Sequence, residues 1–160
     1  MGLAIEYQAG RGKEHDMKQG MIVIVEDNPD DEELMLIAFK RHKLANEIVV
    51  LRDGVEAVDF MLGTGAYEGR DISAQPQVIL LDLKLPKLNG LDVLKRLRAD
   101  ARTAVIPVVV LTTSKEEGDM LASYKLGANS FVTKPVDFNK FAEAVKQLGL
   151  YWLLLNQTPA

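Results

Sequence analysis

Short apolar runs alternate along the chain with longer segments whose apolar residues recur at spacings of three and four. The short runs are rich in β-branched residues and predict five strands, at residues 21–25, 48–51, 78–81, 108–111 and 130–133. The longer segments predict helices at residues 29–43, 55–62, 91–97, 115–126 and 137–155. Because the strands are apolar on both faces and alternate with helices, the pattern predicts a doubly wound α/β domain around a parallel sheet.

The remaining segments have no sustained apolar period. Residues 1–20 combine glycines with mixed charges and are expected to be a flexible N-terminal extension. The domain is expected to span residues 21–155, including an extended C-terminal helix, and to leave residues 156–160 as a tail. Residues 63–76 form a long connection, which is interpreted as a surface loop or a frayed helix end.

Composition narrows the class of protein. The chain has 160 residues, of which 48% are hydrophobic and 26% charged, as is typical of one globular domain. A net charge of −4 gives no electrostatic indication of nucleic-acid binding, and the basic run at residues 40–43 is interpreted as a helix C-terminus. There is no cysteine and no membrane-length apolar segment, so we expect a cytoplasmic protein without disulfides or membrane contact.

Polar residues follow the predicted strands. Glu26 and Asp27 come after the first strand, Asp82 after the third, Thr112 after the fourth and Lys134 after the fifth. In open α/β sheets the ligand site lies beyond the carboxyl ends of the strands. The sequence therefore predicts that three carboxylates, a hydroxyl group and an ammonium group meet at one edge.

The stretch EDNPDDEE at residues 26–33 crowds six carboxylates. Asn28 and Pro29 suit the start of a helix, so the acidic residues 30–33 face the positive end of its dipole and are interpreted as structural. Glu26 and Asp27 precede that turn and are expected beside Asp82.

A cation explains how these three carboxylates can coexist, because too few basic residues are expected nearby. Ligands that are all oxygen favour a hard divalent ion, and a site with few protein ligands suits Mg²⁺. Asp82 follows four apolar residues and is the predicted nucleophile, since a carboxylate can accept a phosphoryl group. Mg²⁺, Lys134 and Thr112 would then stabilise charge on the phosphoryl oxygens.

Four motifs carry a family resemblance: VEDNPDD, LLDLKLPKLNG, PVVVLTTS and GANSFVTKP. With these motifs the chain resembles a response-regulator receiver domain, of the chemotaxis-regulator type, over about residues 20–150. The resemblance implies a flavodoxin-like fold with strand order 2-1-3-4-5. It also implies that a histidine kinase of a two-component phosphorelay donates a phosphoryl group to switch a protein-interaction face.

The resemblance also implies individual roles. Asp82 is the phosphoacceptor, Glu26 and Asp27 are the acidic metal-binding pair, and Lys84 is a metal ligand through its backbone carbonyl. Thr112 closes on the phosphoryl group, Lys134 binds it, and Phe131 is the aromatic switch position. A cis bond before Pro135 is implied as well. The chain departs from the commonest pattern at Lys84 and Ser114, which flank the path of the hydrolytic water, so the lifetime of the phosphorylated state stays open.

The predicted last helix suggests an output surface. Its apolar positions continue to Trp152 and Leu155, past the expected end of the sheet, where a partner or second subunit is expected. The expected interaction face comprises Tyr124, Phe131, Tyr151, Trp152 and Leu155. The Tyr-Trp-Leu ending that begins at Tyr151 and the long 63–76 connection are similar to those of single-domain regulators paired with bacterial phytochrome histidine kinases. A homodimer through the C-terminal helix is expected.

Three alternatives remain open. The first is a receiver-like interaction module that works without phosphorylation. The second is an aspartate-dependent phosphohydrolase, which typically needs a second acid where this chain has Lys84. The third is a flavin-binding domain, whose first loop should offer hydroxyl and amide groups to a phosphate, whereas EDNPDD would repel one.

Overall fold

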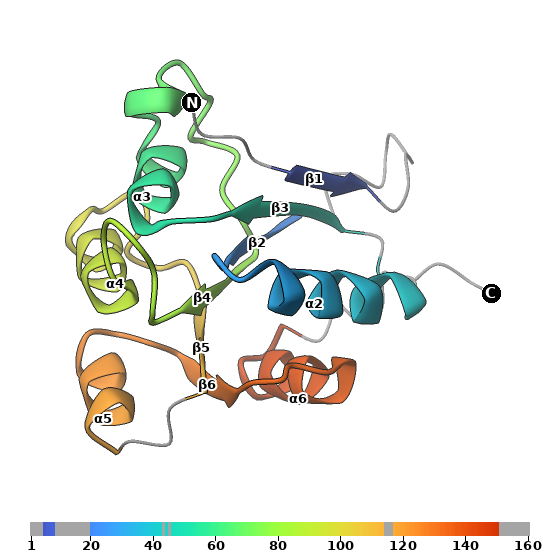
Figure 1. Cartoon of the computed structure of the whole chain (residues 1–160). Coiled ribbons are helices and arrows are strands. Elements are labelled where there is room, and N and C mark those ends of the chain that lie inside the picture. Colours follow the sequence, from blue (N-terminus) through green and yellow to red (C-terminus); the bar gives the residue numbers. More distant parts are fainter. Residues whose placement is uncertain (1–4, 9–19, 43, 45, 114–116, 151–160) are drawn as a thin grey trace.

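The chain folds around a central sheet with helices on both faces (Figure 1). This computed structural model describes residues 5–8, 20–42, 44, 46–113 and 117–150. The parallel strands are β2 (Met21–Val25), β3 (Glu47–Leu51), β4 (Val78–Asp82), β5 (Val108–Thr112) and β6 (Ser130–Thr133). The helices are α2 (Pro29–Arg41), α3 (Gly54–Leu62), α4 (Gly90–Ala99), α5 (Glu117–Lys125) and α6 (Phe138–Gln147), with a short 3₁₀ helix η1 (Gly65–Tyr67).

The strand order confirms the predicted architecture. The sheet runs β1-β3-β2-β4-β5-β6, so the five parallel strands have the expected order 2-1-3-4-5. In this register Ile24 lies between Val50 of β3 and Leu80 of β4. The order reverses at β2, which places the ends of β2 and β4 side by side at the switch point of the fold.

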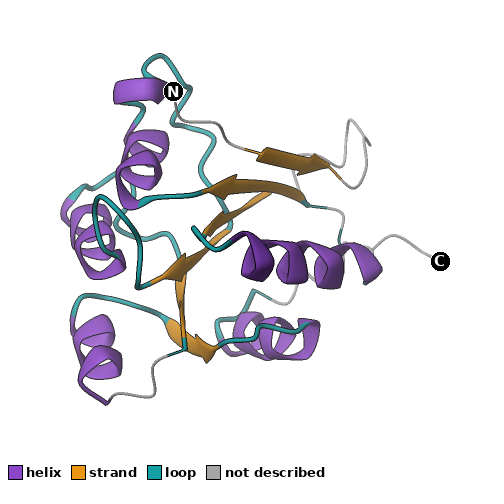
Figure 2. Cartoon of the chain, in the orientation of Figure 1, coloured by secondary structure: helices purple, strands orange, loops and turns teal. Residues whose placement is uncertain are grey.

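Successive residues of each strand face opposite sides of the sheet and enter two separate cores. Ile22 and Ile24 pack with Phe39 of α2 and Phe141 of α6. Val23 and Val25 pack on the other face with residues of α3 and α4 such as Phe60 and Leu94. Figures 1 and 2 show α2 and α6 on one side of the sheet and α3, α4 and α5 on the other. Both faces are therefore covered, as the apolar strands predict.

A sixth strand differs from the expectation that residues 1–20 lie outside the fold. The strand β1 (Ile5–Gln8) pairs antiparallel with β3, with Ile5 opposite Val50 and Gln8 opposite Glu47. Without it, β3 would present unpaired backbone groups at the edge of the sheet. Main-chain pairing supplies the interaction, and a side-chain period over four residues is too short to reveal it.

The last helix is shorter than predicted, which corrects the range 137–155. It ends at Gln147, and Gly149 takes a left-handed φ of 75°. The Gly149 N–H donates to Lys146 O at 3.0 Å and the Leu150 N–H to Val145 O at 2.7 Å, the two bonds of a Schellman motif. Leu150 thereby returns to the core. The expected interaction residues Tyr151, Trp152 and Leu155 lie outside the described residues.

The helix α2 begins at Pro29 as predicted and ends at Arg41, two residues before the predicted end at residue 43. The Asn28 side chain accepts hydrogen bonds from the N–H groups of Asp30 and Asp31, at 2.9 and 3.0 Å. The helix ends at Arg41 with His42 as its C-cap, so the basic run marks a helix C-terminus. Cations at this end interact favourably with the helix dipole.

The connection over residues 63–76 is an ordered surface loop. The Tyr67 hydroxyl donates to Glu56 Oε2 at 2.7 Å, and both burial and this carboxylate raise the pKa of Tyr67. The Arg70 guanidinium donates to Phe60 O at 2.8 Å and to Ala74 O at 2.6 Å, and it stacks on the Phe60 ring. These contacts fasten the loop to α3.

In the part of the chain that the structure describes, every helix is too short or too polar to cross a bilayer.

Candidate functional site

Three acidic side chains meet where the strand order reverses. Glu26 and Asp27 directly follow β2, and Asp82 is the last residue of β4, its neighbour in the sheet. Each offers a carboxylate oxygen, and these oxygens lie within 4.8 Å of one another. The structure thus brings together the three carboxylates that the sequence predicts at this edge.

A glycine allows α4 to approach this strand end closely. The Gly90 N–H donates to Leu83 O at 2.8 Å. A Cβ atom at Gly90 would collide with Asp82 O and would lie 2.6 Å from Leu83 Cα. Any larger residue would push α4 away from β4 or displace the backbone that carries Asp82.

One lysine faces the acidic group from the end of β6. Lys134 Nζ lies 2.8 Å from Asp82 Oδ2 and 2.6 Å from Glu26 Oε1. The peptide bond between Lys134 and Pro135 is cis, as the family resemblance implies. In the sheet, β5 lies between β4 and β6, so Lys134 reaches the carboxylates from a strand that is not adjacent to β4.

Asp31 is a fourth acidic member of the site that the sequence reasoning missed. Its Oδ2 lies 3.1 Å from Lys134 Nζ. Asp31 does stand in the first turn of α2, as expected of a residue that faces a helix dipole. The available signal was its position, because the first turn of a helix that follows β2 lies over the carboxyl ends of the neighbouring strands.

Burial and close contacts shift the pKa values of Glu26 and Lys134. Glu26 is fully buried, and burial raises its pKa to about 7. Contact with Lys134 lowers this pKa, while nearby Asp82 raises it. For Lys134, burial lowers the pKa, but the contacts with Asp82 and Glu26 raise it above its ordinary value. Lys134 consequently stays charged at neutral pH.

The donor set fits a divalent cation. Among the described residues, Lys134 pairs with the carboxylates of Glu26, Asp31 and Asp82, and the carboxylate of Asp27 lies beside those of Glu26 and Asp82. All of these donor atoms are oxygen, and exposed Asp27 leaves the site open to solvent. Hard divalent ions take such ligands and keep water in the open positions. The pocket therefore has the chemistry of a receiver-type divalent-metal site.

Backbone amides orient two of the acids. The Lys84 N–H donates to Asp82 Oδ1 at 3.1 Å, and the Asn28 N–H donates to Glu26 Oε2 at 3.2 Å. Asp82 is 5% exposed, and its carboxylate accepts hydrogen bonds from both Lys84 N–H and Lys134 Nζ. That the Lys84 carbonyl binds the metal stays a prediction.

The structure also places the backbone of Thr112 and the side chains of Phe131 and Tyr124. Thr112 ends β5 and pairs in register with Thr133, which puts its backbone at the same sheet edge, while its side chain is outside the described part. Phe131 is half-buried against the core on the α3 and α4 side of the sheet. Tyr124 of α5 is 47% exposed. Their roles in switching and interaction stay predictions.

Several known proteins are similar to this chain in sequence and in fold. The profile of the "Response regulator receiver domain" matches residues 22–146. Response regulator Rcp1 of Synechocystis sp. is 38% identical over 140 residues, which are 88% of this chain and 93% of that protein. Its Mn²⁺-bound crystal structure has a TM-score of 0.70 at 37% identity and covers 88% of this chain and 99% of that one.

Two further solved structures are similar. The bacteriophytochrome response regulator AtBRR has a TM-score of 0.76 at 51% identity, covering 83% of this chain and 94% of that one. The phosphorylated cyanobacterial phytochrome response regulator RcpA has a TM-score of 0.71 at 36% identity, covering 89% and 99%. The chain therefore belongs to the response regulator receiver domain family, the phosphorylation-based switches of two-component signalling.

Proposed function

We propose that Asp82 accepts a phosphoryl group from a histidine kinase in a Mg²⁺-dependent reaction, and that this modification switches a protein-interaction face. The observation that carries the proposal is the setting of the Asp82 carboxylate. It stands at the end of β4, bonded to Lys84 N–H and Lys134 Nζ, with Glu26 and Asp27 at the distance of shared metal ligands.

In the proposed reaction an Asp82 oxygen attacks the phosphorus of a phosphohistidine. A P–O bond forms while the P–N bond breaks, and the imidazole nitrogen keeps the electron pair. Glu26, Asp27, Asp82 and the Lys84 carbonyl would hold the divalent cation, which when bound neutralises charge on the phosphoryl oxygens. Lys134 pairs with one phosphoryl oxygen and Thr112 donates its hydroxyl to another. The chain promotes its own phosphorylation and dephosphorylation and is not a turnover enzyme.

The proposed partners are inferred from the similar proteins, from two residues of the expected interaction face and from the net charge. Similarity to AtBRR supports a sensor histidine kinase of the bacteriophytochrome class as phosphodonor. Exposed Tyr124 and half-buried Phe131 support an output face. From the sequence we expect Tyr151, Trp152 and Leu155 to belong to this face and a second copy of the chain to bind there. The net charge of −4 supports protein partners in the cytoplasm over nucleic acid or an anionic membrane.

The test uses Mg²⁺ and a small acyl-phosphate donor with intact mass as the readout. Wild type gains one phosphoryl group, and Asp82→Asn gains none because an amide is a poor nucleophile. Asp92→Asn, at an exposed aspartate in the first turn of α4, is the matched control and labels like wild type. Labelling of Asp82→Asn would disprove the assignment. An unlabelled wild type that still binds Mg²⁺ would favour an interaction module that works without phosphorylation.

A further inference from the structure

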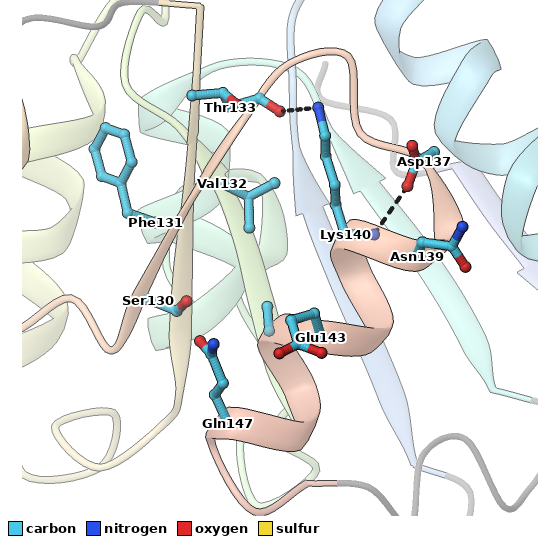
Figure 3. Close-up of a pocket in the computed structure, with 10 residues that line it drawn as sticks. Ser130, Phe131, Val132, Thr133, Asp137, Asn139, Lys140, Glu143 and Gln147 are labelled. Atoms are coloured by element: carbon cyan, nitrogen blue, oxygen red, sulfur yellow. Dashed lines mark hydrogen bonds between the residues drawn. The ribbon is translucent and has the colours of Figure 1, made fainter.

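Lys140 contacts the backbone on both sides of Lys134. Its Nζ donates to Pro135 O at 2.9 Å and to Thr133 O at 3.3 Å. Figure 3 shows the Lys140 side chain rising from α6 toward Thr133. A single ammonium group therefore holds the two carbonyls that flank the residue bonded to Asp82.

The base of this lysine is fixed. The Asp137 side chain caps α6 by accepting from Lys140 N–H at 2.8 Å, as Figure 3 shows. Phe141, the next residue, is 1% exposed and packs on Phe39 with ring centroids 4.6 Å apart. The first turn of α6 is thus anchored in the core, so Lys140 links a rigid helix to the turn that follows β6.

On its inner side this turn is supported by the pairing of Thr133 with Thr112 of β5. The strand β6 is the last strand of the described sheet, with β5 on its inner side and no further strand on its outer side. Pro135 is exposed and has no N–H to donate. The Lys140 ammonium supplies the bonds that a neighbouring strand would otherwise give.

We infer that Lys140 is a positioning residue for phosphoryl transfer. It holds the Thr133–Pro135 turn so that the Lys134 ammonium lies against Asp82 and Glu26, where the phosphoryl oxygens would bind. The inference rests on the proposed phosphorylation of Asp82. Lys140 does not touch the reacting atoms, and it acts only through the backbone of Lys134.

The experiment compares three variants of the full chain. Lys140→Met keeps the aliphatic stem and removes the charge, Lys140→Arg restores a donor, and Lys146→Met removes an exposed lysine from the last turn of the same helix. Phosphorylation rates at saturating acyl phosphate are recorded with Mg²⁺ affinity and thermal midpoint, at a temperature where every variant is folded.

We expect the maximal rate of Lys140→Met to fall about tenfold, which is less than the roughly hundredfold that a misplacement of about 1 Å can cost. Mg²⁺ affinity does not fall with the rate, because Lys140 touches none of the carboxylates and a displaced Lys134 competes less with the metal for Glu26 and Asp82. Lys140→Arg recovers most of the rate, and Lys146→Met keeps all of it.

The outcomes separate the two proposals. A wild type that is never labelled refutes the proposed function. A labelled wild type whose rate is matched by Lys140→Met refutes the positioning role. An equal loss in Lys146→Met also refutes it, because the loss would then not depend on contact with the turn. A rate that stays low in Lys140→Arg refutes it too, because a restored donor would have failed to restore the position of Lys134.

Discussion

Neighbouring residues of the site have different chemistry because their burial differs. Glu26 is fully buried and contacts Lys134, whereas the adjacent Asp27 is exposed. Burial disfavours the charged form of a carboxylate, which is why the pKa of Glu26 rises to about 7. Burial thus brings the loss of the Glu26 proton into the range of neutral pH.

The raised pKa of Glu26 predicts a pH-dependent metal affinity. Below pH 7 the metal-free folded protein holds a proton on Glu26, and a cation must displace it. Mg²⁺ affinity should therefore fall as the pH drops from 7 toward 5, by up to about tenfold per pH unit if one proton is released. Isothermal titration calorimetry in buffers of different ionisation enthalpy measures both the affinity and the proton release.

The same proton has the opposite effect on folding: the free energy of unfolding should fall as the pH rises, whereas Mg²⁺ affinity should rise. Between the ordinary pKa of 4.5 and the folded value of about 7, the folded metal-free state binds the proton more tightly than the unfolded state. The Glu26 contribution to the free energy of unfolding is thus fully present below pH 4.5 and is lost as the pH rises through 7. Glu26→Gln is the control and should remove both pH dependences. A wild-type affinity that is flat from pH 5 to 7 would contradict this prediction.

The C-terminal end of α6 determines where the chain returns to the core. The helix α6 stops at Gln147 because Gly149 takes a left-handed φ and two backbone bonds close the turn. Leu150 then packs in the core together with Val145. An apolar period that continues past residue 150 cannot show this stop, because the stop depends on backbone conformation at one glycine.

Gly149→Ala isolates that backbone requirement. No atom lies within 4 Å of a Cβ at this position, so the cost comes from the φ of 75° alone. We expect a loss of about 1 kcal/mol in the free energy of unfolding. Urea denaturation measures it. Gln147→Ala, in the last helical turn, is the control and should change the free energy by less than about 0.5 kcal/mol. Equal effects of both changes would argue against the motif.

At the scale of the whole molecule, the site exists because the sheet order joins distant segments. The ends of β2 and β4 are neighbours at the switch point, and β6 delivers Lys134 from two strands away. The added strand β1 lies at the far edge, beyond β3. The strand β3 therefore lies between the N-terminal strand and β2, whose end carries the first acidic residues of the site.

Removal of residues 1–19 should consequently leave the chemistry intact. We expect the truncated chain to fold and to be phosphorylated at the wild-type rate, since its parallel strands and both cores remain. Amides of β3 should exchange hydrogen faster, because that strand becomes an edge. Hydrogen-exchange mass spectrometry checks this, with peptides from β4 and β5 as internal controls. Unchanged exchange in β3 would contradict the pairing of β1.

Much of the fold and site could be predicted from the sequence. Apolar runs indicated all five parallel strands, and Asn28 and Pro29 marked the start of α2. Glu26, Asp27, Asp82 and Lys134 could be found because parallel strands put their carboxyl ends at one edge. The strand β1, the end of α6 and the contact of Asp31 with Lys134 could not, since they depend on backbone pairing, one glycine conformation and side-chain reach.

The sequence by itself determined the alternation of strands and helices, the acidic strand ends and the family, because these depend on residue type and spacing. Only the tertiary structure decided which groups bond. It set Lys134 among Glu26, Asp31 and Asp82, and it placed the Lys140 ammonium on the backbone beside Lys134. Such contacts join residues up to 108 positions apart, from Glu26 to Lys134, so they arise only when the sheet assembles.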